Sequence, residues 1–173
     1  MPLEEWKPVE DFPEYLVSSL GQIYNTRQDK LMAKSRTTQG DLKVTMSIGG
    51  DRVTRSVRVL VAEAFVAKPV AGRGFHRTAV PDTVIVLDGD QENITSYNLA
   101  WRPRWFANRY ARQFKVPQPA DFEFRPVMNL NTRAIYNNIL EAGMREGLLF
   151  VDIYKSATTG TNVYPGDSAF VFP

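Results

Sequence analysis

The chain has 173 residues, of which 43% are hydrophobic and 23% charged, so it can bury a core and form one or two small domains. Its net charge of +2, from 21 Lys and Arg against 19 Asp and Glu, is too small to identify a partner, and the absence of Cys excludes a thiolate nucleophile, a Cys-ligated metal site and disulfides. No apolar run approaches the roughly 20 residues of a membrane span, and no basic segment precedes an apolar one at the N-terminus, so we expect a cytoplasmic protein that avoids membranes.

Short apolar segments broken by turn residues fill the first third of the chain. Apolar and polar residues alternate over residues 42–48, and Gly49-Gly50-Asp51 separates this run from RVTRSVRVLV, which is typical of a β-hairpin. The run Val59–Val66 predicts a short helix, because helix formers occupy its middle and its apolar residues share one face. These elements predict a β-rich module over residues 1–68.

A loop, two strand segments and a helix are expected in the middle of the chain. Gly and Pro break the run Lys68–Pro81, which therefore predicts a loop. A strand over Thr83–Leu87, an Asp-Gly turn and a second segment ending near Trp101 come next, followed by a helix over about Arg104–Phe114. We group these elements into a second module, residues 69–116.

The remaining residues, 117–173, predict a third module. Two prolines indicate a linker near Gln118–Phe122, and a hairpin with its turn at Asn129–Thr132 follows. Helices are expected over about Asn138–Arg145 and Leu149–Ala157, joined as a helix-turn-helix. The residues expected to pack the two helices together are Ile139, Leu140, Gly143, Val151, Ile153 and Tyr154.

Positive charge gathers in two parts of the chain, although the total charge is small. A basic face on a nearly neutral protein is the electrostatic footprint of a DNA-binding protein. The alternative is that these charges are scattered over a solvated surface. The residues predicted to contact DNA are Arg52, Arg55, Arg58, Arg73, Arg77, Arg102, Arg104, Arg109, Arg112 and Lys115.

Three blocks of sequence together resemble a known family. Thr83–Trp101 reads TVIVLDGDQENITSYNLAW, WKPV at Trp6–Val9 and LVAEAF at Leu60–Phe65 precede it, and TRAIY at residues 132–136 follows it. In this order they resemble the HNH homing endonucleases of phages and group I introns. The resemblance implies an α+β fold with a small antiparallel sheet module, a ββα-metal (HNH-like) unit and a C-terminal helix-turn-helix-like segment. If a phage encodes the chain, the expected location is the host cell cytoplasm.

The resemblance also implies which positions would carry phosphodiester hydrolysis. The family's general-base His falls at Val86, and the neighbour that helps to hold the metal ion falls at Ile85. The second metal ligand falls at Ala107, with Asn108 one residue beyond it on the helix. Alkyl side chains have no lone pair with which to accept a proton or bind a hard cation. Asn98 matches the Asn that orients the His, so we expect a degenerate site with no assignable catalytic residue.

Two features leave cleavage open as an alternative. His76 is the single His of the chain and lies in the Gly-rich loop, where it could substitute for the missing base. Asp88 and Asp90 are weak candidates for binding Mg²⁺ or Mn²⁺, which would be needed only if nuclease activity survives. No other cofactor is expected.

Three functions remain as hypotheses. The first is a phage-type protein that binds double-stranded DNA without cleaving it, so that the chain is not an enzyme. The second is a protein that binds a host or phage protein by reusing the fold, with the weakly charged C-terminal part making the contact. The third is a divergent, active, metal-dependent DNA nickase. The sequence indicates no oligomeric state.

Overall fold

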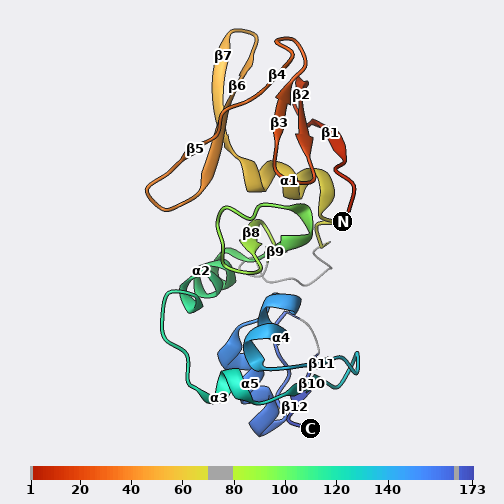
Figure 1. The fold of residues 1–173 in the computed structure, drawn as a ribbon, viewed down its shortest axis with the longest axis vertical. Coiled ribbons are helices and arrows are strands. Elements are labelled where there is room, and N and C mark those ends of the chain that lie inside the picture. Colours follow the sequence, from red (N-terminus) through yellow and green to blue (C-terminus); the bar gives the residue numbers. More distant parts are fainter. Residues whose placement is uncertain (1, 70–79, 166–167) are drawn as a thin grey trace. The chain divides into compact units, whose positions relative to one another are not determined.

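The computed structural model describes residues 2–69, 80–165 and 168–173, and it divides into two compact units. Unit 1 is Met1–Arg104 and unit 2 is Trp105–Pro173. Small antiparallel sheets and short helices build both units, which confirms the predicted α+β class (Figure 1). The finer division into modules 1–68, 69–116 and 117–173 stays a prediction. Among the described residues, no helix has the length and apolar character to cross a membrane.

Unit 1 begins with two small antiparallel sheets. The first has four strands in the order β1 (Trp6–Val9), β2 (Phe12–Ser18), β3 (Ile23–Asn25) and β4 (Lys30–Leu31). The second has three strands in the order β5 (Ser35–Arg36), β6 (Leu42–Ile48) and β7 (Asp51–Ser56). The predicted hairpin is confirmed as β6 and β7, and its turn uses Gly49 and Gly50, whose φ angles of 57° and 91° suit glycine.

The helix α1 (Val57–Phe65) joins the two sheets of unit 1 into one core. It begins two residues before the predicted start and packs against strands of both sheets, whose ends it crosses in Figure 1. Val57, Leu60 and Val61 are buried, because residues three and four apart share one helix face. The predicted helix is therefore confirmed, and these residues form its buried face.

A second hairpin completes unit 1. Strands β8 (Thr83–Val86) and β9 (Leu99–Arg102) pair antiparallel, with Val84 opposite Trp101 and the short 3₁₀ helix η2 (Ser96–Asn98) before β9. Val84, Val86, Leu99 and Trp101 join the same core as the two sheets. Most of the loop predicted over 68–81 lies outside the described residues.

Unit 2 contains helices around a small sheet. Its helices are α2 (Arg104–Gln113), which starts one residue before the unit, α3 (Asp121–Phe124), α4 (Ile139–Glu146) and α5 (Phe150–Thr159). Its sheet has the order β11 (Ile135–Tyr136), β10 (Val127–Asn129) and β12 (Phe170–Val171). The hairpin predicted around residues 129–132 is confirmed as β10 and β11.

The join between α4 and α5 follows from three local features. The Asn138 side chain caps α4 by accepting a hydrogen bond from the Glu141 N–H at 2.7 Å, and Gly147 ends the helix at φ 67°. Gly143 leaves room for the Phe150 ring, which a Cβ at that position would overlap. The two predicted helices are confirmed, whereas their assignment as a helix-turn-helix and a DNA-reading role for it stay predictions.

Two expectations about unit 2 are wrong. The predicted linker near Gln118–Phe122 runs into α3, because Phe122 is buried and packs 5.3 Å, between ring centroids, from Tyr154. Val151 was expected to pack with Ile153 but is 59% exposed. Residues two apart on a helix are rotated by about 200°, so they cannot share a buried face.

Candidate functional site

The Asp-Gly-Asp turn between β8 and β9 is held by the side chain of Asp88. Its Oδ1 accepts hydrogen bonds from Asn98 Nδ2 and from the Asp90 N–H, both at 2.9 Å. Its Oδ2 accepts a hydrogen bond from Asn93 Nδ2 at 2.7 Å. Gly89 adopts φ 76°, a conformation that favours glycine. Asp88 therefore stabilises the turn through hydrogen bonds to both of its carboxylate oxygens.

Asn98 completes this network with every polar atom of its side chain. Its Nδ2 donates to Asp88 Oδ1 and, at 2.7 Å, to the Asn93 carbonyl, while its Oδ1 accepts from the Asp88 N–H at 3.2 Å. The residue is only 7% exposed. The family position that would orient a catalytic His thus has a structural role in this chain, because its donors and acceptor are already engaged.

The positions expected to be degenerate are buried and apolar. Val86 is 3% exposed and lies in the core of unit 1, and Ile85, its neighbour on β8, is 4% exposed. Ala107 is 8% exposed on α2 in unit 2, whereas Asn108 next to it is exposed. None of the three buried side chains offers a proton acceptor or a metal ligand.

Asp88 and Asp90 are the candidate ligands for a divalent metal ion at this turn, and hydrogen bonds within the turn occupy part of their acceptor sites. A hard cation requires several oxygen ligands, but the Asp88 carboxylate is engaged and Asp90 Oδ1 accepts a hydrogen bond from the Glu92 N–H at 3.0 Å. Within ranges 2–69, 80–165 and 168–173, no group of three His, Asp or Glu side chains could hold a metal ion. Both carboxylates instead stabilise the loop that connects β8 to β9.

The basic residues of unit 1 divide into engaged and exposed ones. Arg55 forms an ion pair with Glu63 at 3.4 Å, and Arg58 Nε lies 3.3 Å from Asp41 Oδ1. Because these two guanidinium groups are paired with carboxylates of the same unit, they are less available to bind DNA phosphates. Arg52 is exposed on β7, and no ion pair involves it in the described part of the chain.

The helix α2 presents a basic face in unit 2. Its buried face carries Phe106 and Tyr110, and the Tyr110 hydroxyl donates to the Gly143 carbonyl at 3.2 Å. No carboxylate of the described residues forms an ion pair with the cations on or next to its exposed face. These exposed cations are Arg104, Arg109, Arg112 and Lys115.

Four predicted residues stand apart from this basic face. Arg102 is half-buried and donates to the Trp101 carbonyl at 2.9 Å. Arg73, Arg77 and the possible substitute base His76 lie outside the described residues, so their roles stay predictions.

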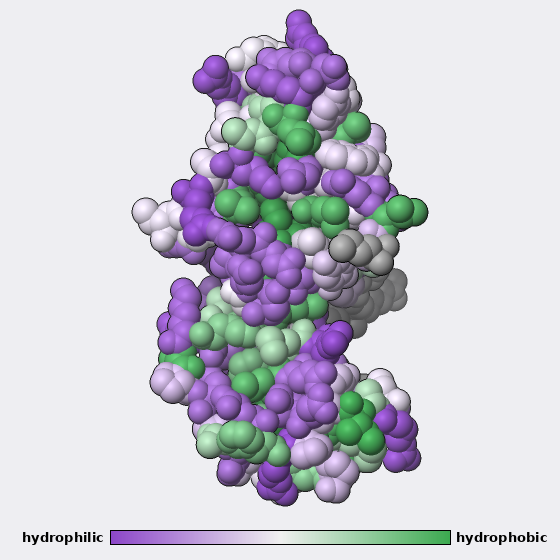
Figure 2. Space-filling view, viewed as in Figure 1, coloured by the Kyte–Doolittle hydropathy of each residue, from purple (hydrophilic) through white to green (hydrophobic). Residues whose placement is uncertain are grey.

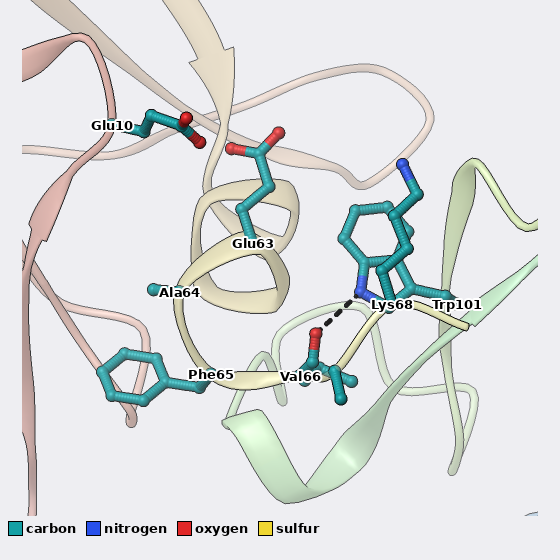
Figure 3. A pocket seen from close by; sticks show the side chains of 8 residues that line it. Glu10, Glu63, Ala64, Phe65, Val66, Lys68 and Trp101 are labelled. Atoms are coloured by element: carbon teal, nitrogen blue, oxygen red, sulfur yellow. Dashed lines mark hydrogen bonds between the residues drawn. The ribbon is translucent and has the colours of Figure 1, made fainter. Parts of the chain in front are cut away.

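A pocket in unit 1 was not anticipated from the sequence. It has a volume of about 470 Å³ and lies beside the C-terminal end of α1 (Figure 3). The Trp101 indole N–H donates to the Val66 carbonyl at 3.0 Å, and Lys68 Nζ lies 4.6 Å from the Trp101 ring centroid. Glu10 and Glu63 also line the pocket. Residues so far apart in the chain gave no local signal for this site.

Comparisons with known proteins place these features in a family context. Residues 4–48 match the NUMOD4 motif. The chain is 34% identical over 65 residues to the H-N-H endonuclease F-TflII of Escherichia phage T5, covering 38% of this chain and 34% of that one. It is 26% identical over 99 residues to an uncharacterised HNH endonuclease of Acanthamoeba polyphaga mimivirus, covering 57% of this chain and 23% of that one. The matches therefore span about a third or less of these relatives.

A solved structure supports the fold over nearly the whole chain. It is described as DNA binding and cleavage by the HNH homing endonuclease I-HmuI, and it aligns with a TM-score of 0.52 over 98% of both chains at 19% identity. At this identity the likeness establishes the fold alone. Together with the NUMOD4 motif and the two endonuclease relatives, it leads to one conclusion: the chain is related to the HNH homing endonucleases.

Proposed function

We propose that this chain binds double-stranded DNA and does not cleave it. The observation that carries the proposal is Val86, which occupies the expected general-base position as a buried alkyl side chain in the core of unit 1. Phosphodiester hydrolysis requires a group that takes a proton from the attacking water and a cation that stabilises the leaving oxygen. Val86 cannot take the proton, and Ile85 and Ala107 cannot hold the cation.

The retained residues of the motif support the same proposal. Asp88, Asn93 and Asn98 bond to one another and to the backbone of the turn, so each has a structural explanation that requires no catalysis. The hairpin of β8 and β9 can therefore remain folded without residues that catalyse cleavage.

Support for DNA binding comes from α2. Arg109 and Arg112 lie on the exposed side with Trp105, at spacings of three and four residues that share one helix face. Arg109 Cζ lies 5.9 Å from the Trp105 ring centroid, and the described carboxylates leave both guanidinium groups available for other anions. Guanidinium groups bind phosphate oxygens through two parallel hydrogen bonds, so this face suits the DNA backbone.

The proposal is tested by gel-shift binding and supercoiled-plasmid nicking in parallel, with Mg²⁺ or Mn²⁺ and over a salt series. We expect binding that weakens steeply with salt, because each neutralised phosphate contributes about −0.9 to the slope of log K against log salt. Replacing both arginines, Arg109→Gln and Arg112→Gln, should reduce the slope by about 1.8, equivalent to about tenfold in affinity between 50 and 200 mM salt. Arg27→Gln is the matched control, since its side chain is 79% exposed in unit 1.

Each result has a defined meaning. Binding without nicking, with the slope reduced only by the α2 substitutions, supports the proposal. Metal-dependent nicking would overturn the loss of cleavage and direct attention to His76. Absence of salt-dependent binding would overturn DNA as the partner.

Restoring the site tests the assignment of its positions. The triple substitution Ile85→Asp, Val86→His and Ala107→Asn supplies the base and the metal ligands that the family resemblance implies. We expect nicking to appear with Mg²⁺ or Mn²⁺ in the substituted chain. If the substituted chain binds DNA normally but never nicks it, the assignment of these three positions is wrong.

A further inference from the structure

The β1–β4 sheet carries apolar side chains on both of its faces. On one face Tyr15, Val17 and Ile23 are buried in the core of unit 1. Successive residues of a strand point to opposite faces, so Leu16 and Tyr24 point away from this core. Antiparallel sheets with one face in the core are normally polar on the other. The outer face of this sheet departs from that rule.

The outer side chains form a continuous row across all four strands. Pro8 is opposite Leu16, Leu16 is opposite Tyr24, and Tyr24 is opposite Leu31 in the strand register. Trp6 lies against the Tyr24 ring, edge to face, at 6.2 Å between ring centroids. Side chains directly opposite each other on paired strands are in contact range. We call these five residues the outer row.

The outer row is accessible to a partner. Leu31 is 56% exposed and Trp6 is 39% exposed, and Pro8 is also exposed. Figure 2 shows hydrophobic side chains at the surface of unit 1 among hydrophilic ones. A contiguous apolar patch with a polar rim is typical of an interaction surface, whereas single exposed apolar residues are common everywhere.

The segment that carries the outer row contains more acidic than basic residues. Residues 4–31 contain six carboxylates against three cations, in a chain whose total charge is positive. Arg27 lies 4.0 Å from Glu14, and outside this pair five carboxylates stand against two cations, of which Lys7 donates to the Ala64 carbonyl at 3.0 Å. The exposed carboxylates of this acidic rim are Glu4, Glu5, Glu10, Asp11, Glu14 and Asp29.

This charge decides between possible occupants. DNA phosphates would be repelled, and a second copy of the same face would bring like charges together. A partner with Lys or Arg beside its apolar residues would be attracted. The pocket of Figure 3 shows the same combination of acidic and aromatic groups. Glu10 lines it from the turn between β1 and β2. Its Phe65 and Trp101 rings already contact the ammonium groups of Lys7 and Lys68.

We propose that the outer row docks a protein segment that places apolar side chains on Trp6, Tyr24 and Leu31 and Lys or Arg side chains at the acidic rim. The surface uses residues other than the α2 arginines, so it does not depend on the proposed DNA binding. It gives the chain a second partner of a different class.

The test titrates the full chain into a fluorescein-labelled amphipathic peptide of Leu and Lys and follows fluorescence anisotropy. A peptide with Glu in place of Lys is the charge control. We expect the Leu–Lys peptide to bind, and Trp6→Ser or Leu31→Ser to weaken it about tenfold, as for an exposed anchor in an interface. Ile48→Ser is the matched variant, since Ile48 is 47% exposed on β6 outside the outer row, and it should leave binding unchanged.

Several results would overturn the proposal. These are no binding of the Leu–Lys peptide, equal binding of the Leu–Glu peptide, or equal effects of Leu31→Ser and Ile48→Ser. Sedimentation that shows dimers of the chain abolished by Leu31→Ser would assign the surface to a second copy instead. DNA affinity that falls with Leu31→Ser would assign it to nucleic acid.

Discussion

Replacing Asn98 by Ala should destabilise unit 1 substantially, for structural reasons that do not involve catalysis. The substitution removes three hydrogen bonds, of which one is donated to the Asp88 carboxylate. A neutral hydrogen bond contributes about 1 kcal/mol net and one to a charged group about 1.5–3 kcal/mol. Because Asp88 is only partly buried, water replaces some of what is lost, and we expect a decrease of about 2–4 kcal/mol in the free energy of unfolding.

Urea unfolding followed by far-UV circular dichroism measures this decrease, and hydrogen exchange of the β8 and β9 amides locates it. Gln28→Ala is the control, because Gln28 is exposed in the same unit and surface substitutions usually change stability by less than about 0.5 kcal/mol. A loss below about 1 kcal/mol, with amide exchange unchanged, would refute the view that Asn98 braces the turn.

Three further predictions concern single positions. Gly143→Ala should lower the stability of unit 2 by about 1–3 kcal/mol, measured by urea unfolding, because the added Cβ overlaps the Phe150 ring and lies 3.0 Å from a backbone carbonyl. Burial and the hydrogen bond to Glu146 raise the pKa of Tyr136 above its ordinary 10.0. The stability from this bond is therefore present below pH 10 and is lost as the pH rises through the raised pKa. Tyr136→Phe should be less stable than the parent at pH 7, with a gap that narrows in alkaline urea titrations. Val86→His alone should lower stability by about 1–3 kcal/mol, by thermal unfolding, because it buries a polar ring among apolar side chains.

Local sequence signals predicted the elements that local physics determines. The hairpin of β6 and β7 was predictable because apolar and polar residues alternate over residues 42–48 and two adjacent glycines mark the turn. The helix α4 was predictable because Gly147 marks its end and Asn138 caps its start. The assignment of Ile85 and Val86 to the family's catalytic positions stays a prediction from the motif, and in the structure both side chains are buried.

Features that depend on distant partners could not be predicted in this way. The sequence predicted that Arg55 and Arg58 would be available to DNA. In the folded chain Arg55 pairs with Glu63 and Arg58 pairs with Asp41. The linker near residue 122 read as polar and proline-rich, but the single residue Phe122 anchors it in the core. The outer row has no local sequence signal, because its members come from four short strands whose register is defined only in the folded chain.

The buried alkyl groups at the end of β8 bear on how the loss of cleavage proposed above could be reversed. Val86 and Ile85 are nearly completely removed from water, and each such side chain stabilises a fold by about 1.5–3 kcal/mol. A first substitution toward a working site would lose this stabilisation without giving cleavage, because a general base cannot act without the metal ligands. Each intermediate along the path would be less stable and still inactive. If cleavage has been lost as proposed, selection for stability alone would therefore oppose its return, while the hydrogen bonds of Asp88 would continue to stabilise the turn.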